Sequence, residues 1–203
     1  MHKLFGSALT CCGVFAALTT ADIARSQDVP VRLVKFADDK AAEEVKIEAL
    51  TLKPPASWKK EPPANRLRLA QFKIPAAEGD KAPAELVISS FAGGGGGVEP
   101  NLQRWVSQFQ PKDRKVKVTT GTCPQGEYYF SDLTGTFNRP IGPPIAGKTE
   151  AVPGSRSLGV ILIVGKEAYF LKLTGPEKTV GEAADAFRAS FGGDAAQEKP
   201  YEK

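Results

Sequence analysis

Apolar and polar residues alternate along this chain in several short stretches, which is the pattern of β-strands with one buried face. The alternation is clear at residues 66–74 and 115–120, and the composition of residues 45–52, 85–91, 126–137, 158–164 and 168–173 also predicts strands. Short glycine-containing segments at residues 121–126 and 165–167 each separate two of these stretches. Because such short connections join neighbouring strands, the sequence predicts two β-hairpins in its second half.

Helical periodicity begins abruptly after five consecutive glycines at residues 93–97. The apolar residues that follow recur at the spacing of one helix face: Val98, Leu102, Trp105, Val106 and Phe109. Pro100 suits the first helical turn, where its missing N–H group costs nothing, and Glu99 complements the positive end of the helix dipole. The pattern predicts a helix over residues 98–109, with Trp105 in the core.

The glycine run itself allows two interpretations. It could hold a phosphate group at the start of the helix, but Val98 and Glu99 stand where a phosphate-binding loop of the Walker type has lysine and serine or threonine. We therefore expect a tightly turning connection, in which some glycines have positive φ and others are merely flexible.

A final helix is expected after residue 174. Its buried stripe is Val180, Ala184, Phe187 and Phe191, and two glycines follow as a C-terminal cap. Residues 138–155 contain four prolines and three glycines. We expect them to form a long loop, and such loops are often functional or mobile.

The first 26 residues have the features of a cleavable secretory signal peptide. Lys3 lies in a short basic start, and an apolar stretch over residues 4–18 follows. That stretch is shorter than the ~20 residues of a membrane-spanning helix. Cys11 and Cys12 raise the alternative of a lipoprotein, but the residues before them fit a lipidation site poorly. The sequence predicts a periplasmic or secreted protein with no stable membrane span after cleavage.

Four parts are expected along the chain. They are a signal peptide (residues 1–26), an N-terminal arm or linker (27–44), a single α+β domain (45–193) and a disordered polar tail (194–203). The chain that remains after cleavage is long enough to bury a substantial core in one domain.

Charge and composition exclude several function classes. Cleavage after Ser26 lowers the formal net charge from +4 to +3, with no block of basic residues of the kind that binds nucleic acid. His2 is the only histidine and Cys123 the only cysteine beyond the signal peptide. Histidine-based catalytic triads and imidazole-rich metal sites are therefore excluded from the mature chain, and so is an intramolecular disulfide. We expect no cofactor and no metal.

The polar candidates for ligand binding are Asn101 and Arg104 on the first predicted helix and Arg139 in the predicted long loop. Lys172 lies between apolar neighbours in a strand, so it faces either solvent or the helix layer. Arg68 is expected on a solvated strand face.

Three motifs together resemble a family of uncharacterised exported bacterial proteins over most of residues 50–191. The first contains Trp58 and Arg68-Leu69-Ala70, the second runs from the glycines to Phe109, and the third is Tyr169-Phe170-Leu171-Lys172-Leu173-Thr174-Gly175-Pro176. The third motif, followed by a helix with phenylalanines, also resembles the end of the PsbP-type fold. That resemblance implies an α+β fold in which a mainly antiparallel sheet has helices on both faces, a PsbP-like α/β/α sandwich. It implies no catalytic residues.

These observations lead us to expect an exported, non-catalytic binding or accessory domain, whose partner is an unknown envelope protein or a small ligand. The alternative is a hydrolase or transferase that uses carboxylate or lysine chemistry, since neither chemistry requires histidine.

Overall fold

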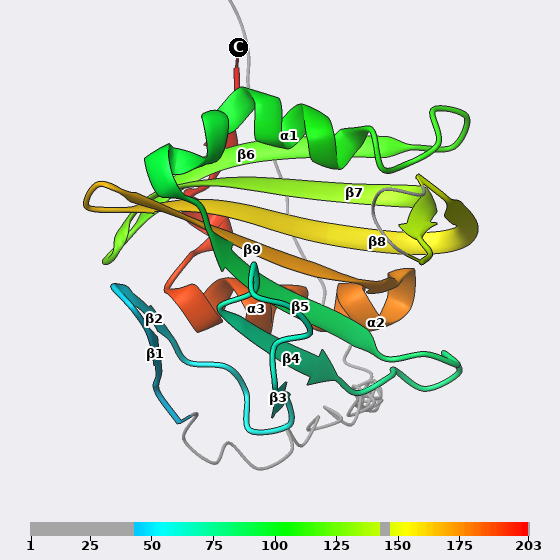
Figure 1. Cartoon of the computed structure of the whole chain (residues 1–203), viewed down its shortest axis with the longest axis horizontal. Helices are drawn as coiled ribbons and strands as arrows, with labels where there is room; N and C mark the ends of the chain where they lie inside the picture. The colour runs from blue at the N-terminus through cyan, green and yellow to red at the C-terminus, as the bar shows by residue number, and fades with distance from the viewer. Residues whose placement is uncertain (1–42, 143–146, 203) are drawn as a thin grey trace, which may run out of the picture. The chain divides into compact units, whose positions relative to one another are not determined.

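One large antiparallel sheet forms the centre of the fold in the computed structural model, which describes residues 43–142 and 147–202 (Figure 1). Its strands are β3 (Lys59–Glu61), β4 (Ala70–Ile74), β5 (Ala84–Ser90), β6 (Lys115–Cys123), β7 (Gly126–Pro140), β8 (Thr149–Val164), β9 (Glu167–Pro176) and β10 (Lys199–Pro200). Their spatial order is β10-β6-β7-β8-β9-β5-β4-β3. Every strand pair in this part of the chain is antiparallel. The predicted α+β fold with a mainly antiparallel sheet is confirmed.

The stretch 45–52, expected as one strand, is a separate hairpin of β1 (Val45–Ile47) and β2 (Leu50–Leu52). The predicted signal peptide and nearly all of the predicted arm, residues 1–42, lie outside the described residues.

The described residues also form α1 (Val98–Val106), α2 (Glu177–Glu182), α3 (Ala184–Phe191) and the short 3-10 helices η1 (Ala92–Gly96) and η3 (Ala195–Gln197). Helix α1 follows its predicted stripe, with Leu102 and Trp105 buried. It ends three residues earlier than expected, because Phe109 leaves the helix and bridges to Phe137. The predicted final helix is divided into α2 and α3.

Neighbouring residues of β8 pack into two different hydrophobic clusters. Val160 belongs to a cluster with Phe187 of α3, whereas Ile161 belongs to a cluster with Trp105 of α1. Because consecutive side chains of a strand point to opposite faces, α1 and α3 contact different faces of the sheet. Trp105 lies so close to Gly159 that a Cβ atom there would come within 2.5 Å of its ring. The predicted core position of Trp105 is confirmed.

The glycine run forms a left-handed turn before α1. All five glycines have positive φ, between 64° and 88°, a region in which a side chain clashes with its own backbone. A Cβ atom on Gly95 would also come within 2.8 Å of the Phe170 ring, whereas the other four positions open into free space. The expectation that some of these glycines are merely flexible is therefore wrong.

Strands β7 and β8 extend into the segment 138–155. Arg139 pairs with Glu150 and Pro140 with Thr149. The expectation of a long loop is therefore wrong for residues 138–140 and 149–155, which belong to the two strands. Pro140 is the last residue of β7, where a missing N–H costs little. Backbone pairing with the facing strand outweighs the loop-like local composition.

Residues 194–202 pack against the sheet, so the prediction of a disordered tail is wrong for them. Strand β10 pairs with β6. The side chain of Glu198, just before β10, is only 4% exposed. This carboxylate accepts hydrogen bonds from Arg188 Nε at 2.8 Å and Thr119 Oγ1 at 2.7 Å. Both partners lie on elements that no local pattern connects to the tail.

Candidate functional site

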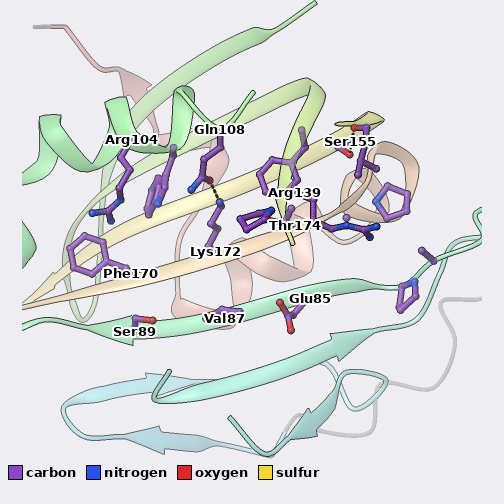
Figure 2. Close-up of a pocket in the computed structure, with 18 of the residues that line it drawn as sticks. Glu85, Val87, Ser89, Arg104, Gln108, Arg139, Ser155, Phe170, Lys172 and Thr174 are labelled. Atoms are coloured by element: carbon purple, nitrogen blue, oxygen red, sulfur yellow. Dashed lines mark hydrogen bonds between the residues drawn. The ribbon is translucent and has the colours of Figure 1, made fainter. Parts of the chain in front are cut away.

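A groove of about 710 Å³ opens on the α1 side of the sheet, between α1, β5, β9 and the paired ends of β7 and β8 (Figure 2). Val87 and Ser89 of β5 lie opposite Lys172 and Phe170 of β9, and these alternate residues line its floor. The residues between them, such as Leu171, face the α3 side and belong to the core. Strand alternation thus places Lys172 on the groove side, toward the helix layer rather than α3.

The walls of the groove are mostly apolar. Several prolines and two valines contribute to them, together with four aromatic rings from distant parts of the chain: Phe91, Trp105, Phe137 and Phe170. Trp105 and Phe170 meet edge to face with ring centroids 6.4 Å apart, so part of the wall is continuous with the core beneath α1. Such a surface suits an apolar ligand body.

Charged side chains in the groove are predominantly cationic. The lining includes four basic residues and one acid, Glu85. Arg68 is paired with Glu85 at 2.9 Å, and Arg139 is paired with Glu150 at 2.5 Å. Their charges are therefore largely balanced within the protein.

Arg104 and Lys172 have no such balance, since neither forms a salt bridge with any residue that the structure describes. Arg104 Nη2 donates to Asn101 Oδ1 at 2.5 Å. Lys172 Nζ donates to Gln108 Oε1 and lies 5.2 Å from the ring centroid of Phe137. Figure 2 shows Arg104 extending from α1, and Gln108 from the turn after it, toward β9, where Lys172 points up to Gln108.

The environment of Lys172 disfavours its charge. Burial and the nearby positive charge of Arg104 lower the pKa of its ammonium group from the ordinary value of 10.5 to about 8. At neutral pH the group still carries a proton, so two cations without acidic partners share this part of the groove.

Two of the three predicted binding residues come together here. Arg104 and Arg139 line the same groove from α1 and β7. Asn101 does not line it; its side chain is buried and its Nδ2 donates to the carbonyl oxygens of Gly95 at 2.8 Å and Gly97 at 2.6 Å. Asn101 therefore ties α1 to the glycine turn and orients Arg104 through its own amide oxygen.

The site residues predicted from the sequence do not include Lys172, Gln108 or Arg68. The sequence signal that could have identified Lys172 is its position as a single lysine in the apolar run of β9. It lies on the same strand face as Phe170. The sequence left open whether that face met solvent or a helix, because the answer depends on where α1 packs.

None of the helices that the structure describes has the length and apolar character needed to cross a membrane. Within the same residues, no three side chains from the metal-binding types histidine, cysteine, aspartate and glutamate cluster at a metal-binding distance.

No protein-family model matches the chain, and no curated protein sequence matches it. Among solved structures, it is similar to cyanobacterial PsbP (CyanoP) from Synechocystis sp. PCC 6803, with a TM-score of 0.45 and 12% identity over 85% of this chain and 99% of that chain. It is also similar to PA94, a protein of unknown function from Pseudomonas aeruginosa, with a TM-score of 0.41 and 16% identity over 72% of this chain and 91% of that chain. Both likenesses concern the fold alone and bring no function to this chain.

Proposed function

We propose that this protein is an exported, non-catalytic module that binds a small amphipathic anion, a molecule with an apolar body and one acidic group. The observation that carries this proposal is the pair Arg104 and Lys172, two cations without acidic partners among the described residues, set in an aromatic groove.

Arg104 and Lys172 both lack an acidic partner among the described residues. Lys172 is partly buried, so its unpaired charge is costly, whereas Arg104 is exposed and keeps its charge in contact with solvent. An anionic group bound beside both would supply a partner for each. The aromatic walls would take up the apolar part of the ligand, and a groove of about 710 Å³ has the size of known small-molecule sites. The lining includes one carboxylate, Glu85, which is held by Arg68, so the carboxylate form of the alternative, a hydrolase or transferase that uses carboxylate or lysine chemistry, gains no support.

A matched pair of fluorescent dyes tests this proposal. Anilinonaphthalene sulfonate carries one sulfonate on an aromatic body, and phenylnaphthylamine has the same body without the charge. We expect the sulfonate dye to bind more tightly to the wild type. Arg104→Gln and Lys172→Gln should each weaken its binding about tenfold, the value of one charge-assisted hydrogen bond, and leave the uncharged dye unaffected.

Two control variants calibrate this experiment. Lys166→Gln removes the same charge from an exposed turn on the same hairpin, and it should leave the binding of both dyes unchanged. Arg139→Gln removes a cation that Glu150 already balances, so it should weaken binding less than Arg104→Gln does. Equal binding of the two dyes to the wild type would refute the proposal.

Binding of the sulfonate dye should also depend on pH. The Lys172 pKa of about 8 means that the free groove loses one positive charge as pH rises from 7 to 9. Affinity should therefore be close to its maximum at pH 7 and fall as pH rises through 8 to 9, and this fall should be absent from Lys172→Gln.

Export is the second part of the proposal and rests on the signal-like residues 1–26. We expect intact mass spectrometry of the exported protein to give an N-terminus between Asp22 and Asp28 without lipid mass. A diacylglyceryl adduct on Cys11 or Cys12 would overturn this part.

A further inference from the structure

We infer that the Lys172 amine is a covalent capture site, which forms an imine with ligands that carry both an aldehyde or ketone group and an anionic group. This inference rests on the proposed function, because the anionic group would be received by Arg104. It adds a reaction at a named atom and a narrower class of ligand.

The contacts of Lys172 orient its amine without pairing it with a negative charge. Its Nζ donates to the amide oxygen of Gln108, and an amide orients the amine without supplying the negative charge with which a carboxylate would hold the proton. The charged groups on the surrounding elements do not balance the ammonium either. Arg104 adds positive charge, Glu85 is held by Arg68, and Arg139 is held by a carboxylate of its own hairpin.

The pKa of about 8 supports this geometry. At pH 7.5 about a quarter of Lys172 is then neutral, against about 0.1% of an ordinary lysine in water. A lysine placed in an apolar site next to another cation is a recognised form of activated amine nucleophile.

The reaction balances without any further reagent. The neutral amine nitrogen attacks the carbonyl carbon, a C–N bond forms, and the carbonyl oxygen takes up a proton to give a carbinolamine. The C–O bond then breaks, and the oxygen leaves as water with the two protons that the amine has lost. No oxidant or reductant takes part, and the resulting imine reverts by hydrolysis.

The position of Arg104 selects the ligand class. Arg104 lines the groove next to Lys172 and has no acidic partner among the described residues, so a carboxylate on the ligand can lie beside the guanidinium while the carbonyl carbon meets the amine. Oxo acids with an aromatic or aliphatic body fit this description, since the remaining walls are apolar.

Reductive trapping tests the inference directly. The full chain is treated at pH 7.5 with sodium cyanoborohydride and benzaldehyde, or with carboxybenzaldehyde, and the modified lysines are identified by peptide mass spectrometry. We expect Lys172 to be modified by benzaldehyde at least tenfold faster than the exposed Lys166. Carboxybenzaldehyde should modify it faster still, and Arg104→Gln should remove that second advantage.

Gln108→Glu tests whether Lys172 reacts because its amine is neutral or merely because it is accessible. It keeps the shape of the contact but places a carboxylate against the amine, so benzaldehyde capture at pH 7.5 should fall at least tenfold and recover near pH 10. Modification of Lys172 no faster than Lys166, or no effect of Gln108→Glu, would overturn the inference.

Failure of this inference can be told apart from failure of the proposed function. If the sulfonate dye binds as expected but benzaldehyde is not captured, anion binding stands and imine formation is refuted. If benzaldehyde is captured but neither the dye nor carboxybenzaldehyde gains from Arg104, the anionic ligand class is refuted for both.

Discussion

Replacing Lys172 with methionine should make the protein more stable at pH 7. The wild-type ammonium group is held in a partly buried position, near Arg104 and without an acidic partner among the described residues. Methionine keeps most of the apolar stem and its contacts but removes the disfavoured charge. A residue whose removal stabilises the fold is one that folding alone does not explain.

The magnitude follows from the pKa. A lowering from 10.5 to about 8 means that the charged form costs the folded state up to ~3 kcal/mol at pH values well below 8. The substitution also removes the hydrogen bond from Lys172 to Gln108, worth about 1 kcal/mol. The net expectation is a stabilisation of about 1–2 kcal/mol, or about 2–8 °C in Tm for a domain of this size.

The sign of the pH dependence is the sharper test. Because the folded pKa lies below the unfolded one, the unfolded chain binds more protons between pH 8 and 10.5, and the wild type gains stability as pH rises through this range. The advantage of Lys172→Met in urea denaturation should therefore be largest at pH 7 and shrink toward pH 10. The other titrating groups are the same in both proteins, so their contributions cancel when the two free energies of unfolding are subtracted at each pH.

Lys166→Met is the matched control, because it makes the same substitution at an exposed turn and should change stability by less than about 0.5 kcal/mol. The reasoning is refuted if Lys172→Met is less stable than the wild type at pH 7. It is refuted equally if the difference between the two proteins does not change with pH.

Four further substitutions test the fold around the groove and at the C-terminal tail, each by its urea midpoint. Trp105→Ala should destabilise by roughly 3–5 kcal/mol because the ring is buried; an unchanged midpoint would place it on the surface. Gly94→Ala should cost about 1–2 kcal/mol for its positive φ, and Gly95→Ala should cost more because its Cβ would also clash with the ring beneath it; equal costs would contradict that contact. Glu198→Ala should cost about 3–5 kcal/mol by leaving Arg188 buried without its partner, and it should expose the C-terminal residues to proteases; unchanged stability and proteolysis would mean that the tail is not held.

The candidate site was predictable from sequence only in part. Arg104 and Arg139 stand out as polar residues on a helix and in a proline-rich segment, and the structure brings both to one groove. Lys172 and Gln108 are separated by 64 residues, and no local pattern relates them. Their contact depends on how α1 packs across β9.

By itself, the sequence determined most strands of the sheet, the helix that carries Trp105 and the position of the glycine turn before it, because periodicity and glycine content act over a few neighbouring residues. The tertiary structure decided which face of β9 meets a helix, where the C-terminal tail packs and which charged side chains remain unpaired. The tail illustrates the reason: Glu198 is polar and tail-like in sequence, yet Thr119, 79 positions away, helps to bury it. Burial and charge pairing depend on contacts between distant segments, which only the packed chain contains.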